Sequence, residues 1–344
     1  MPDMKKKPAA TVTEKTSAHC QQRQSFRIPL KFNVLMASQS GISGNTSQAH
    51  APISKRKVGL GFIRRRSQWL WLFFGSITLG FCIFHFQYVP AEGMRQRLLP
   101  GEWFLYQQKY YQFAMQLHLM TTLTSSILFV FQFIPYIRDN YRQFHRVSGR
   151  IAFILLFIGS MSGITISQRA FGGSMSTRSA SLTLAIMTAF STFKSWRSIR
   201  LRRVNEHRKW TLRCAFYMGS IISVRGTLLF TAIATMWLAP QYVVFRCDEL
   251  DFTMALGAAR RNVSVLSLEA KYPACQGTRA LAVVPVLSAF RGSYEEVASV
   301  LRLSFGASMW LALVLHAVGV EFYLNSSAPQ ESKARQSTSK EKTT

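Results

Sequence analysis

The sequence predicts an all-α fold, a polytopic integral membrane helix bundle of about six transmembrane helices. Apolar residues gather in nearly uncharged stretches of about 20 residues, which match the roughly 30 Å hydrocarbon core of a bilayer. Basic residues cluster between some of these stretches and are scarce between others. This alternation is typical of the positive-inside pattern of multi-pass membrane proteins.

The chain begins with a polar segment, residues 1–67, which is rich in Ser, Gln, Lys and Arg and nearly free of acidic residues. Too few apolar residues are present to offset the entropy of ordering, so we expect a disordered, basic cytosolic tail. A transit peptide shares this bias, but Pro2-Asp3 and Lys5-Lys6-Lys7 do not form an amphipathic helix. Arg64-Arg65-Arg66, directly before the first span, favours contact with anionic lipid at the cytosolic face.

The transmembrane domain is expected to cover residues 68–325. Its six expected spans are Trp69 to about Tyr88, Gln112 to Tyr136, Gly149 to Ser167, Ser179 to about Ser195, Trp210 to Leu238 and Phe305 to Leu324. The fifth has nearly 30 residues, which exceeds the usual 17 to 25, so it should tilt or project beyond the bilayer. Leu281–Phe290 is too short to cross and is interrupted by Pro285, so an interfacial or re-entrant segment is expected.

The charges between the spans orient the bundle. The loops 138–150 and 194–213 are far more basic than the loops 91–110 and 169–178, which places the first two in the cytosol. Both termini are then cytosolic, and residues 326–344 form a second disordered tail. The membrane is expected to be the plasma membrane or an endomembrane.

The long loop 241–303 is exoplasmic on this topology and carries two features that suit that side. Cys247 and Cys275 are expected to form a disulfide, which would stabilise the loop by about 3 kcal/mol, and the alternative is two free thiols. Asn262 begins the sequon Asn-Val-Ser and is a candidate glycosylation site. The other cysteines show no metal-ligand spacing, so no metal site is predicted; these are Cys20, Cys82 and Cys214.

Two basic histidine motifs lie between the spans, and we expect each at the start of a helix rising from the cytosol. They read His145-Arg146-x-x-Gly149-Arg150 and His207-Arg208-x-Trp210-x-x-Arg213. Free N–H groups and the positive end of the helix dipole favour anions there. The added guanidinium donors are Arg146, Arg150, Arg208 and Arg213. A lipid headgroup, a haem propionate or a phosphate could bind at such a site. The alternative is that these residues only supply the positive charge on the cytosolic side of the membrane.

These motifs resemble those of a family of predicted multi-pass membrane proteins of unknown function found in bacteria and fungi. The resemblance covers roughly residues 70–325 and extends to His118 and Arg225, and less closely to Trp310 and Glu321. The chain departs from the family pattern at Thr211, where Met is usual, and at His316, where a polar amide is usual. The resemblance implies the architecture and no established reaction.

The depth of the histidines suggests a cofactor. His145 and His207 are expected at the cytosolic boundary, and His118 about 9 Å into the second span from the outer side, at 1.5 Å per residue. One inner and one outer level of histidines is the layout of a two-haem transmembrane cytochrome. These three residues are therefore haem-ligand candidates, with haem b as the cofactor. A transition metal without haem, or a structural or lipid-contacting role, stays open as an alternative.

Arg225 falls near the middle of the fifth span by count. A charge there costs about 2.5–3.5 kcal/mol, so it should face the bundle interior or a wet cavity. We expect its partner to be a carbonyl, an amide such as Gln116, water or a bound anion, and the alternative is snorkelling. Arg225 is therefore an anion-binding candidate.

The net charge of +27 does not predict nucleic-acid binding, because the basic residues follow the membrane spans and no base-reading motif is present. The motifs of acyl transfer, phosphate loops, zinc proteases and dinucleotide binding are also lacking, so an enzyme is not predicted. The leading hypothesis is a haem-binding or redox membrane protein whose partner is the lipid bilayer. The alternatives are a non-enzymatic protein that binds anionic lipid headgroups or a small anion, and a transporter.

Overall fold

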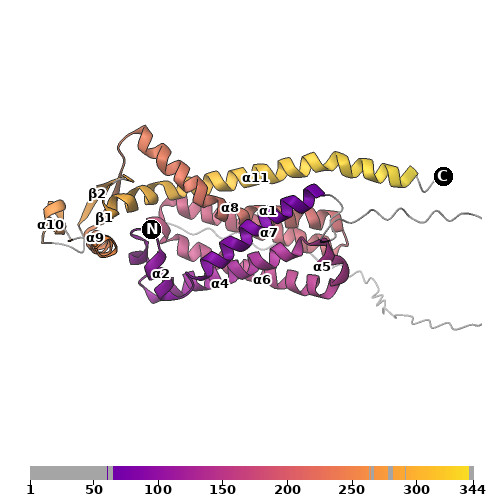
Figure 1. Cartoon of the computed structure of the whole chain (residues 1–344), viewed down its shortest axis with the longest axis horizontal. Helices are drawn as coiled ribbons and strands as arrows, with labels where there is room; N and C mark the ends of the chain where they lie inside the picture. Colours follow the sequence, from indigo (N-terminus) through magenta and orange to yellow (C-terminus); the bar gives the residue numbers. More distant parts are fainter. Residues whose placement is uncertain are drawn as a thin grey trace, which may run out of the picture. The chain divides into compact units, whose positions relative to one another are not determined.

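The computed structural model describes Leu60 and residues 65–340, except 263, 265–266, 278–281 and 291 (Figure 1). The chain divides into the units Met1–Ile53 and Ser54–Thr344, and the description below concerns the second. The expected disordered tail, residues 1–67, lies almost entirely outside the described residues.

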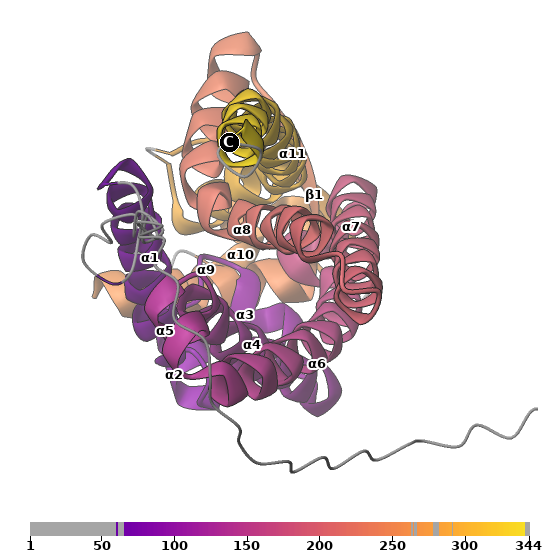
Figure 2. The ribbon, with the colours of Figure 1, turned by 90° about the vertical axis from the view of Figure 1, so that its right-hand side faces the viewer.

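The described part of the chain contains a bundle of six long helices. They are α1 (Arg65–Phe86), α4 (Lys109–Gln132), α6 (Arg142–Ser167), α7 (Met175–Arg200), α8 (Val204–Leu238) and α11 (Tyr294–Lys340). In Figure 2, which looks along the bundle, α1, α4, α6, α7 and α8 follow one another around an arc. The helix α11 lies outside this arc and packs against α8 and α7.

Five helices among the described residues are long and apolar enough to cross a membrane. They are α1, α4, α6, α8 as far as Trp237 and α11 as far as Ser326. The predicted class of an all-α, polytopic membrane bundle is therefore confirmed. α7 is long enough but less apolar, because Ser and Thr are spread along it.

The position of α7 makes it the sixth helix of the bundle. It packs against α6 on one side and α8 on the other, and short turns join it to both. Its small buried side chains face these neighbours, and hydroxyl groups bond its own carbonyls, as Thr188 Oγ1 does to Leu184 O at 2.9 Å. Small and hydroxyl-bearing residues are favoured where membrane helices pack closely. Many of the Ser and Thr side chains that make α7 polar are therefore buried against neighbouring helices and do not face lipid.

The two ends of the bundle differ. We call the end at which α6 and α8 begin the motif end; α5 (Pro135–Asn140) lies there, between α4 and α6. We call the opposite end the cap end. There the 3-10 helix η2 (Ala170–Gly173) joins α6 to α7, with Phe171 and Gly172 at positive φ.

A small domain, which we call the cap, covers the cap end and consists of the described residues of 91–106 and 242–293. Its elements are α2 (Ala91–Arg97), α3 (Glu102–Leu105), β1 (Tyr242–Arg246), α9 (Cys247–Arg261), α10 (Leu268–Lys271), the 3-10 helix η3 (Pro273–Cys275) and β2 (Val283–Leu287). The strands β1 and β2 pair antiparallel, from Tyr242 opposite Leu287 to Arg246 opposite Val283. Buried residues of β1, α9, β2 and α11 form the core of the cap, among them Phe245, Leu250, Val286 and Ala298.

The strand β2 corrects one expectation from the sequence. Leu281–Phe290 was expected to be interfacial or re-entrant, but Val283–Leu287 forms a strand of the cap. Val284 and Val286 are buried while their neighbours are exposed, which is the period-two pattern of a strand with one covered face. Pro285 lacks an N–H group, and a two-stranded sheet tolerates it because both strands are edges.

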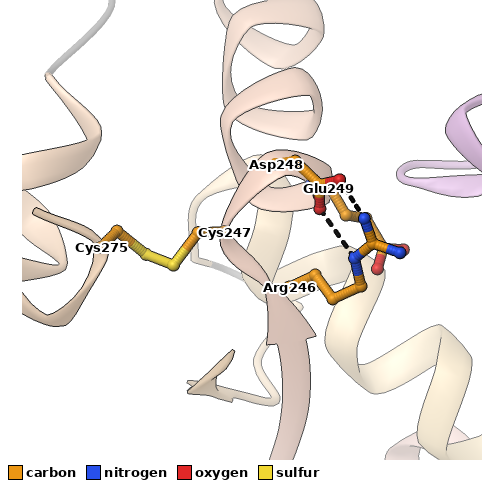
Figure 3. Close-up of a disulfide and its surroundings, with 5 residues drawn as sticks. All are labelled: Arg246, Cys247, Asp248, Glu249 and Cys275. Atoms are coloured by element: carbon orange, nitrogen blue, oxygen red, sulfur yellow. Dashed lines mark hydrogen bonds and ion pairs between the residues drawn. A yellow bond between two sulfur atoms is a disulfide. The ribbon is translucent and has the colours of Figure 1, made fainter. Parts of the chain in front are cut away.

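The predicted disulfide between Cys247 and Cys275 is confirmed, with its Cα atoms 5.7 Å apart (Figure 3). It joins the start of α9 to η3 and is fully buried in the cap core. Cys82 and Cys214, both in bundle helices, are free and buried. Asn262 is exposed just after α9, so its glycosylation stays a prediction.

The helix α11 is longer than the expected span Phe305–Leu324. It begins inside the cap at Tyr294 and continues to Lys340. Residues 326–340, expected in the disordered C-terminal tail, are therefore helical, while residues 341–344 lie outside the described residues. The polar residues of this stretch include Gln, Glu, Lys and Arg, which have good helix propensity.

Candidate functional site

The bundle surrounds a partly open cavity of about 2920 Å³. Residues of α1, α4, α6, α7, α8 and α11 line it, and most of the lining is aliphatic or aromatic. All five histidines of the described residues reach this lining: His85, His118, His145, His207 and His316. The cavity is therefore apolar with imidazoles set into its wall.

His118 on α4 is held in one orientation by α6. Its Nδ1 lies 2.8 Å from the backbone oxygen of Gly159. A carbonyl oxygen only accepts, so Nδ1 carries the proton and donates, which leaves Nε2 with a free lone pair. Gly163 on α6 makes room for the ring, because a Cβ there would lie 3.1 Å from His118 Cε1.

His207 is the fourth residue of α8 and is held in the same tautomer by α7. Its Nδ1 lies 3.0 Å from the backbone oxygen of Ser195 and 2.9 Å from the hydroxyl of the same residue. That hydroxyl also lies 2.7 Å from Thr211 Oγ1. The carbonyl of Ser195 fixes the proton on Nδ1, so Nε2 of His207 is again a free acceptor.

His145 is the fourth residue of α6 and therefore occupies the position in α6 that His207 occupies in α8. Its Nδ1 is buried and has no hydrogen-bond partner among the described residues. The imidazole is close enough to His207 and Arg138 to interact with both electrostatically. The structure thus brings the histidines of the two sequence motifs together at the motif end.

The remaining histidines were not among the ligand candidates chosen from the sequence, because spacing alone does not show which way they face. His85 on α1 bonds the backbone oxygen of Phe81 through Nδ1 at 2.8 Å. His316 on α11 bonds Ser223 Oγ through Nε2 at 2.8 Å, and its Nδ1 is buried without a hydrogen-bond partner in the described part of the chain.

The histidines occupy two levels along the bundle. His118 contacts Gly159, which is 14 residues after His145 on α6, or about 21 Å at 1.5 Å per residue. His316 contacts Ser223, which is 16 residues after His207 on α8, or about 24 Å. His118 and His316 therefore lie at a similar level, well separated from the motif end. Within the described residues, no group of three or more His, Cys, Asp or Glu could hold a metal ion.

The arginines predicted to bind anions fall into different surroundings. Arg146, Arg150 and Arg208 line the cavity at the motif end. Arg213 instead forms a bidentate ion pair with Glu321 of α11, at 2.5 and 2.9 Å, and its guanidinium lies 4.5 Å from the centre of the Trp210 ring. Two of its guanidinium nitrogens are therefore engaged by a carboxylate of the chain itself, and the binding of an external anion by Arg213 stays a prediction.

Arg225 lies beside the end of α1 that faces the cap, and its depth in a bilayer and its binding of an anion stay predictions. It interacts electrostatically with His85 and Tyr88, at the end of α1. Since α1 has 22 residues, or about 33 Å, its end reaches the far boundary of a bilayer core. Arg225 therefore lies near the cap end of α1. The helix α8 has 35 residues and continues beyond Arg225 to Leu238.

A buried acid at the cap end was missed from the sequence. Glu102 of α3 is 4% exposed and accepts a hydrogen bond from the backbone N–H of Phe171 at 2.9 Å. Burial raises the pKa of Glu102 to about 7, although the Phe171 N–H and the charge of Arg302 both lower it. Glu102 also lines the cavity, with Tyr106. Nothing in the local sequence marks this glutamate as buried, because the elements that cover it lie more than 60 residues away.

Comparison with known proteins agrees with the architecture. The chain is 29% identical over 332 residues to "Ava biosynthesis cluster protein G" of Aspergillus versicolor, a match that covers 80% of this chain and 92% of that protein. No solved structure matches the chain. Residues 115–247, which hold His118, both histidine motifs and Arg225, match the family described as "Predicted membrane protein (DUF2306)". Through this central part, the chain is similar to a family of predicted membrane proteins.

Proposed function

We propose that this chain is a haem-binding membrane protein and that the bundle cavity holds haem at two levels, one at His118 and one between His145 and His207. The ligand candidates are His118, His145 and His207. The observation that carries the proposal is the orientation of His118 and His207. A carbonyl of a neighbouring helix holds Nδ1 of each ring and leaves Nε2 free. Metal-bound histidines characteristically donate their other ring nitrogen to such a group.

The residues present fit a haem in three respects. The donor set is imidazole, which is a usual axial ligand of haem iron. The buried Nδ1 of His145 lacks a partner, and a buried polar atom without one is costly, so a ligand or an ordered water is expected beside it. The cavity wall is mainly apolar, as a macrocycle requires.

Each group has a definite task in this proposal. Haem supplies one-electron transfer when it is bound. Ser195 and Gly159 fix the tautomer and the direction of the ligand rings. Arg146, Arg150 and Arg208, at the motif end, are placed to pair with carboxylates of a cofactor bound between His145 and His207. The similarity to a protein named for a biosynthesis cluster is compatible with a role beside a biosynthetic pathway.

The absorption spectrum of the purified protein tests the proposal. We expect a Soret band that is weakened or shifted in His118→Ala and in His207→Ala. His85→Ala is the matched control, since His85 also lines the cavity with Nδ1 on a carbonyl but is not a proposed ligand. A folded protein that stays colourless after expression with excess haem would contradict the proposal. A band lost only in the control variant would contradict the assignment of ligands.

The basic residues at the motif end favour a second candidate, the binding of an anionic headgroup or a small anion. Arg142, Arg146 and Arg150 rise along one helix and line the cavity where α6 begins. Guanidinium groups beside a helix N-terminus attract phosphate and carboxylate. In this case the protein is colourless, and inorganic phosphate raises its unfolding temperature. Arg150→Gln should abolish that rise, and an equal rise in the variant would contradict this second candidate.

A further inference from the structure

The arc of bundle helices is weakly closed between α1 and α8. α1 packs mainly against α4 and touches α8 only lightly, whereas every other pair of neighbours around the arc packs extensively. Residues on both sides of this junction line the cavity, among them Phe81 and Thr78 of α1 and Ile221 and Ile222 of α8. We call this junction the α1–α8 seam. Its lining is largely apolar and runs toward the surface that a bilayer would cover.

Arg225 stands at the cap end of the seam. Its guanidinium lies 6.0 Å from the centre of the Phe81 ring, and His85 and Tyr88 are near enough to interact with it electrostatically. It forms no ion pair with any described residue, and its side chain is exposed to the cavity. Among the described residues, Arg225 is therefore an exposed cation without an ion-pair partner, next to the apolar lining of the seam.

The depth of Arg225 matches that of a lipid headgroup. It lies at the level of His85, in the last turn of the 22-residue helix α1, and of Tyr88, two residues beyond the end of this helix. Headgroup phosphates lie just outside the hydrocarbon core, and aromatic residues such as Tyr collect at the same depth. His85 stacks between Phe81 and Tyr88, with ring centres 3.8 and 5.3 Å away, so this side of the seam is held in place.

We propose that an anionic phospholipid from the bilayer leaflet at the cap end binds in the α1–α8 seam. Its phosphate pairs with Arg225, the Tyr88 hydroxyl offers a second donor, and one acyl chain lies along Phe81, Ile221 and Ile222 toward the cavity. By the distribution of positive charge in the loops, this leaflet is the exoplasmic one.

A lipid fits this seam better than a soluble anion for two reasons. The guanidinium of Arg225 lies next to the apolar lining of the seam. A ligand that is anionic at one end and apolar along its length can therefore contact the guanidinium and the apolar lining at once. The exposed faces of α1 are also strongly apolar, with Phe73, Phe74, Ile83 and Phe84 more than half exposed, so lipid surrounds the seam. The proposal does not depend on haem, because it is carried by contacts of Arg225, Phe81 and Ile222, none of which is a proposed haem ligand.

Lipid retention by the whole chain tests the proposal. The protein would be reconstituted in nanodiscs of phosphatidylcholine with one fifth phosphatidylglycerol, re-extracted, and its bound lipid measured by native mass spectrometry. We expect phosphatidylglycerol to be retained, and the affinity to fall about tenfold in Arg225→Gln, as for loss of one charge-assisted contact. Arg225→Lys should keep most of the retention. Arg178→Gln is the matched control, since Arg178 is an exposed arginine at the cap end of α7.

A second variant distinguishes a loss of lipid binding from misfolding of Arg225→Gln. Ile222→Trp leaves the charge in place and fills the seam, so it should also lower retention. Haem content, if present, should be unchanged in both variants. Retention equal to that of the unchanged protein in Ile222→Trp and Arg225→Gln would overturn the proposal. So would an equal stabilisation by soluble glycerol phosphate, which would identify a small-anion site.

Discussion

Arg302 holds the cap to the bundle. Its guanidinium forms an ion pair with Glu249 of α9, lies 4.1 Å from the centre of the Phe245 ring and packs against the turn at Gly172. Both partners of the ion pair are nearly buried, with side chains 11% and 6% exposed. One residue of α11 therefore links β1, α9 and the turn between α6 and α7.

Removing this guanidinium should be costly. Arg302→Ala leaves the Glu249 carboxylate buried and unpaired, so we expect a loss of about 3–5 kcal/mol in the free energy of unfolding. Arg246→Ala is the control, because the ion pair of Arg246 with Asp248 is far more exposed and should contribute about 0–1 kcal/mol (Figure 3). Thermal unfolding in detergent measures both. Equal losses in the two variants would show that Arg302 does not hold the cap.

Glu102 should make the stability of the cap depend on pH. Its pKa rises from 4.5 to about 7 on folding, so the folded state binds the proton more tightly than the unfolded state. Stability is then highest at low pH and falls as pH rises from about 4.5 to about 7, by roughly 3 kcal/mol at most. Glu102→Gln keeps an acceptor for the Phe171 N–H and removes the titration. Unfolding temperatures measured from pH 5 to 8 should fall in the unchanged protein and stay level in the variant.

At the scale of single elements, Gly159 allows α4 and α6 to pack closely. A Cβ at Gly159 would lie 2.5 Å from Thr122 Cγ2 and 2.9 Å from Thr121 Oγ1, both on α4. Small residues permit such close packing of membrane helices. The same approach places the carbonyl of Gly159 within hydrogen-bond distance of His118. Packing of α4 on α6 therefore also orients a proposed ligand.

Gly159→Ala should separate these helices. We expect a loss of about 1–3 kcal/mol from overpacking, together with a change in any signal that reports on His118. Gly80→Ala on α1 is the matched control, because a Cβ there meets nothing within 4 Å and alanine favours the helix. A variant at position 159 as stable as the one at position 80 would contradict the close packing of α4 and α6.

For the whole molecule, hydropathy was sufficient to predict the class of fold and to locate the bundle helices to within several residues at most ends. It was sufficient because a bilayer requires long apolar helices whatever the details of packing. It could not predict the two-stranded sheet of the cap, since paired residues such as Phe245 and Val284 come from segments about 40 residues apart. It also could not show that Arg225 lies beside the end of α1, because this contact forms between two helices.

The positions of the candidate-site residues along their helices could be predicted from the sequence, but most of their contacts with other helices could not. Spacing identified His145 and His207 as the starts of two helices, and the structure brings them together. It did not show that Glu321 of α11 engages Arg213, or that Ser195 and Gly159 hold imidazoles, because those contacts form between different helices. Contacts of this kind depend on packing, which a single sequence does not reveal.

Both histidine motifs lie on one side of the membrane only if α7 crosses it. Single-cysteine variants would be made in a chain whose free cysteines are replaced, at the exposed positions Asn140, Met175 and Leu201. Labelling in sealed vesicles by a maleimide that cannot cross the membrane measures the side of each. We predict that Asn140→Cys and Leu201→Cys react from one side and Met175→Cys from the other. Reaction of Asn140→Cys and Leu201→Cys from opposite sides, or of all three from the same side, would contradict the account.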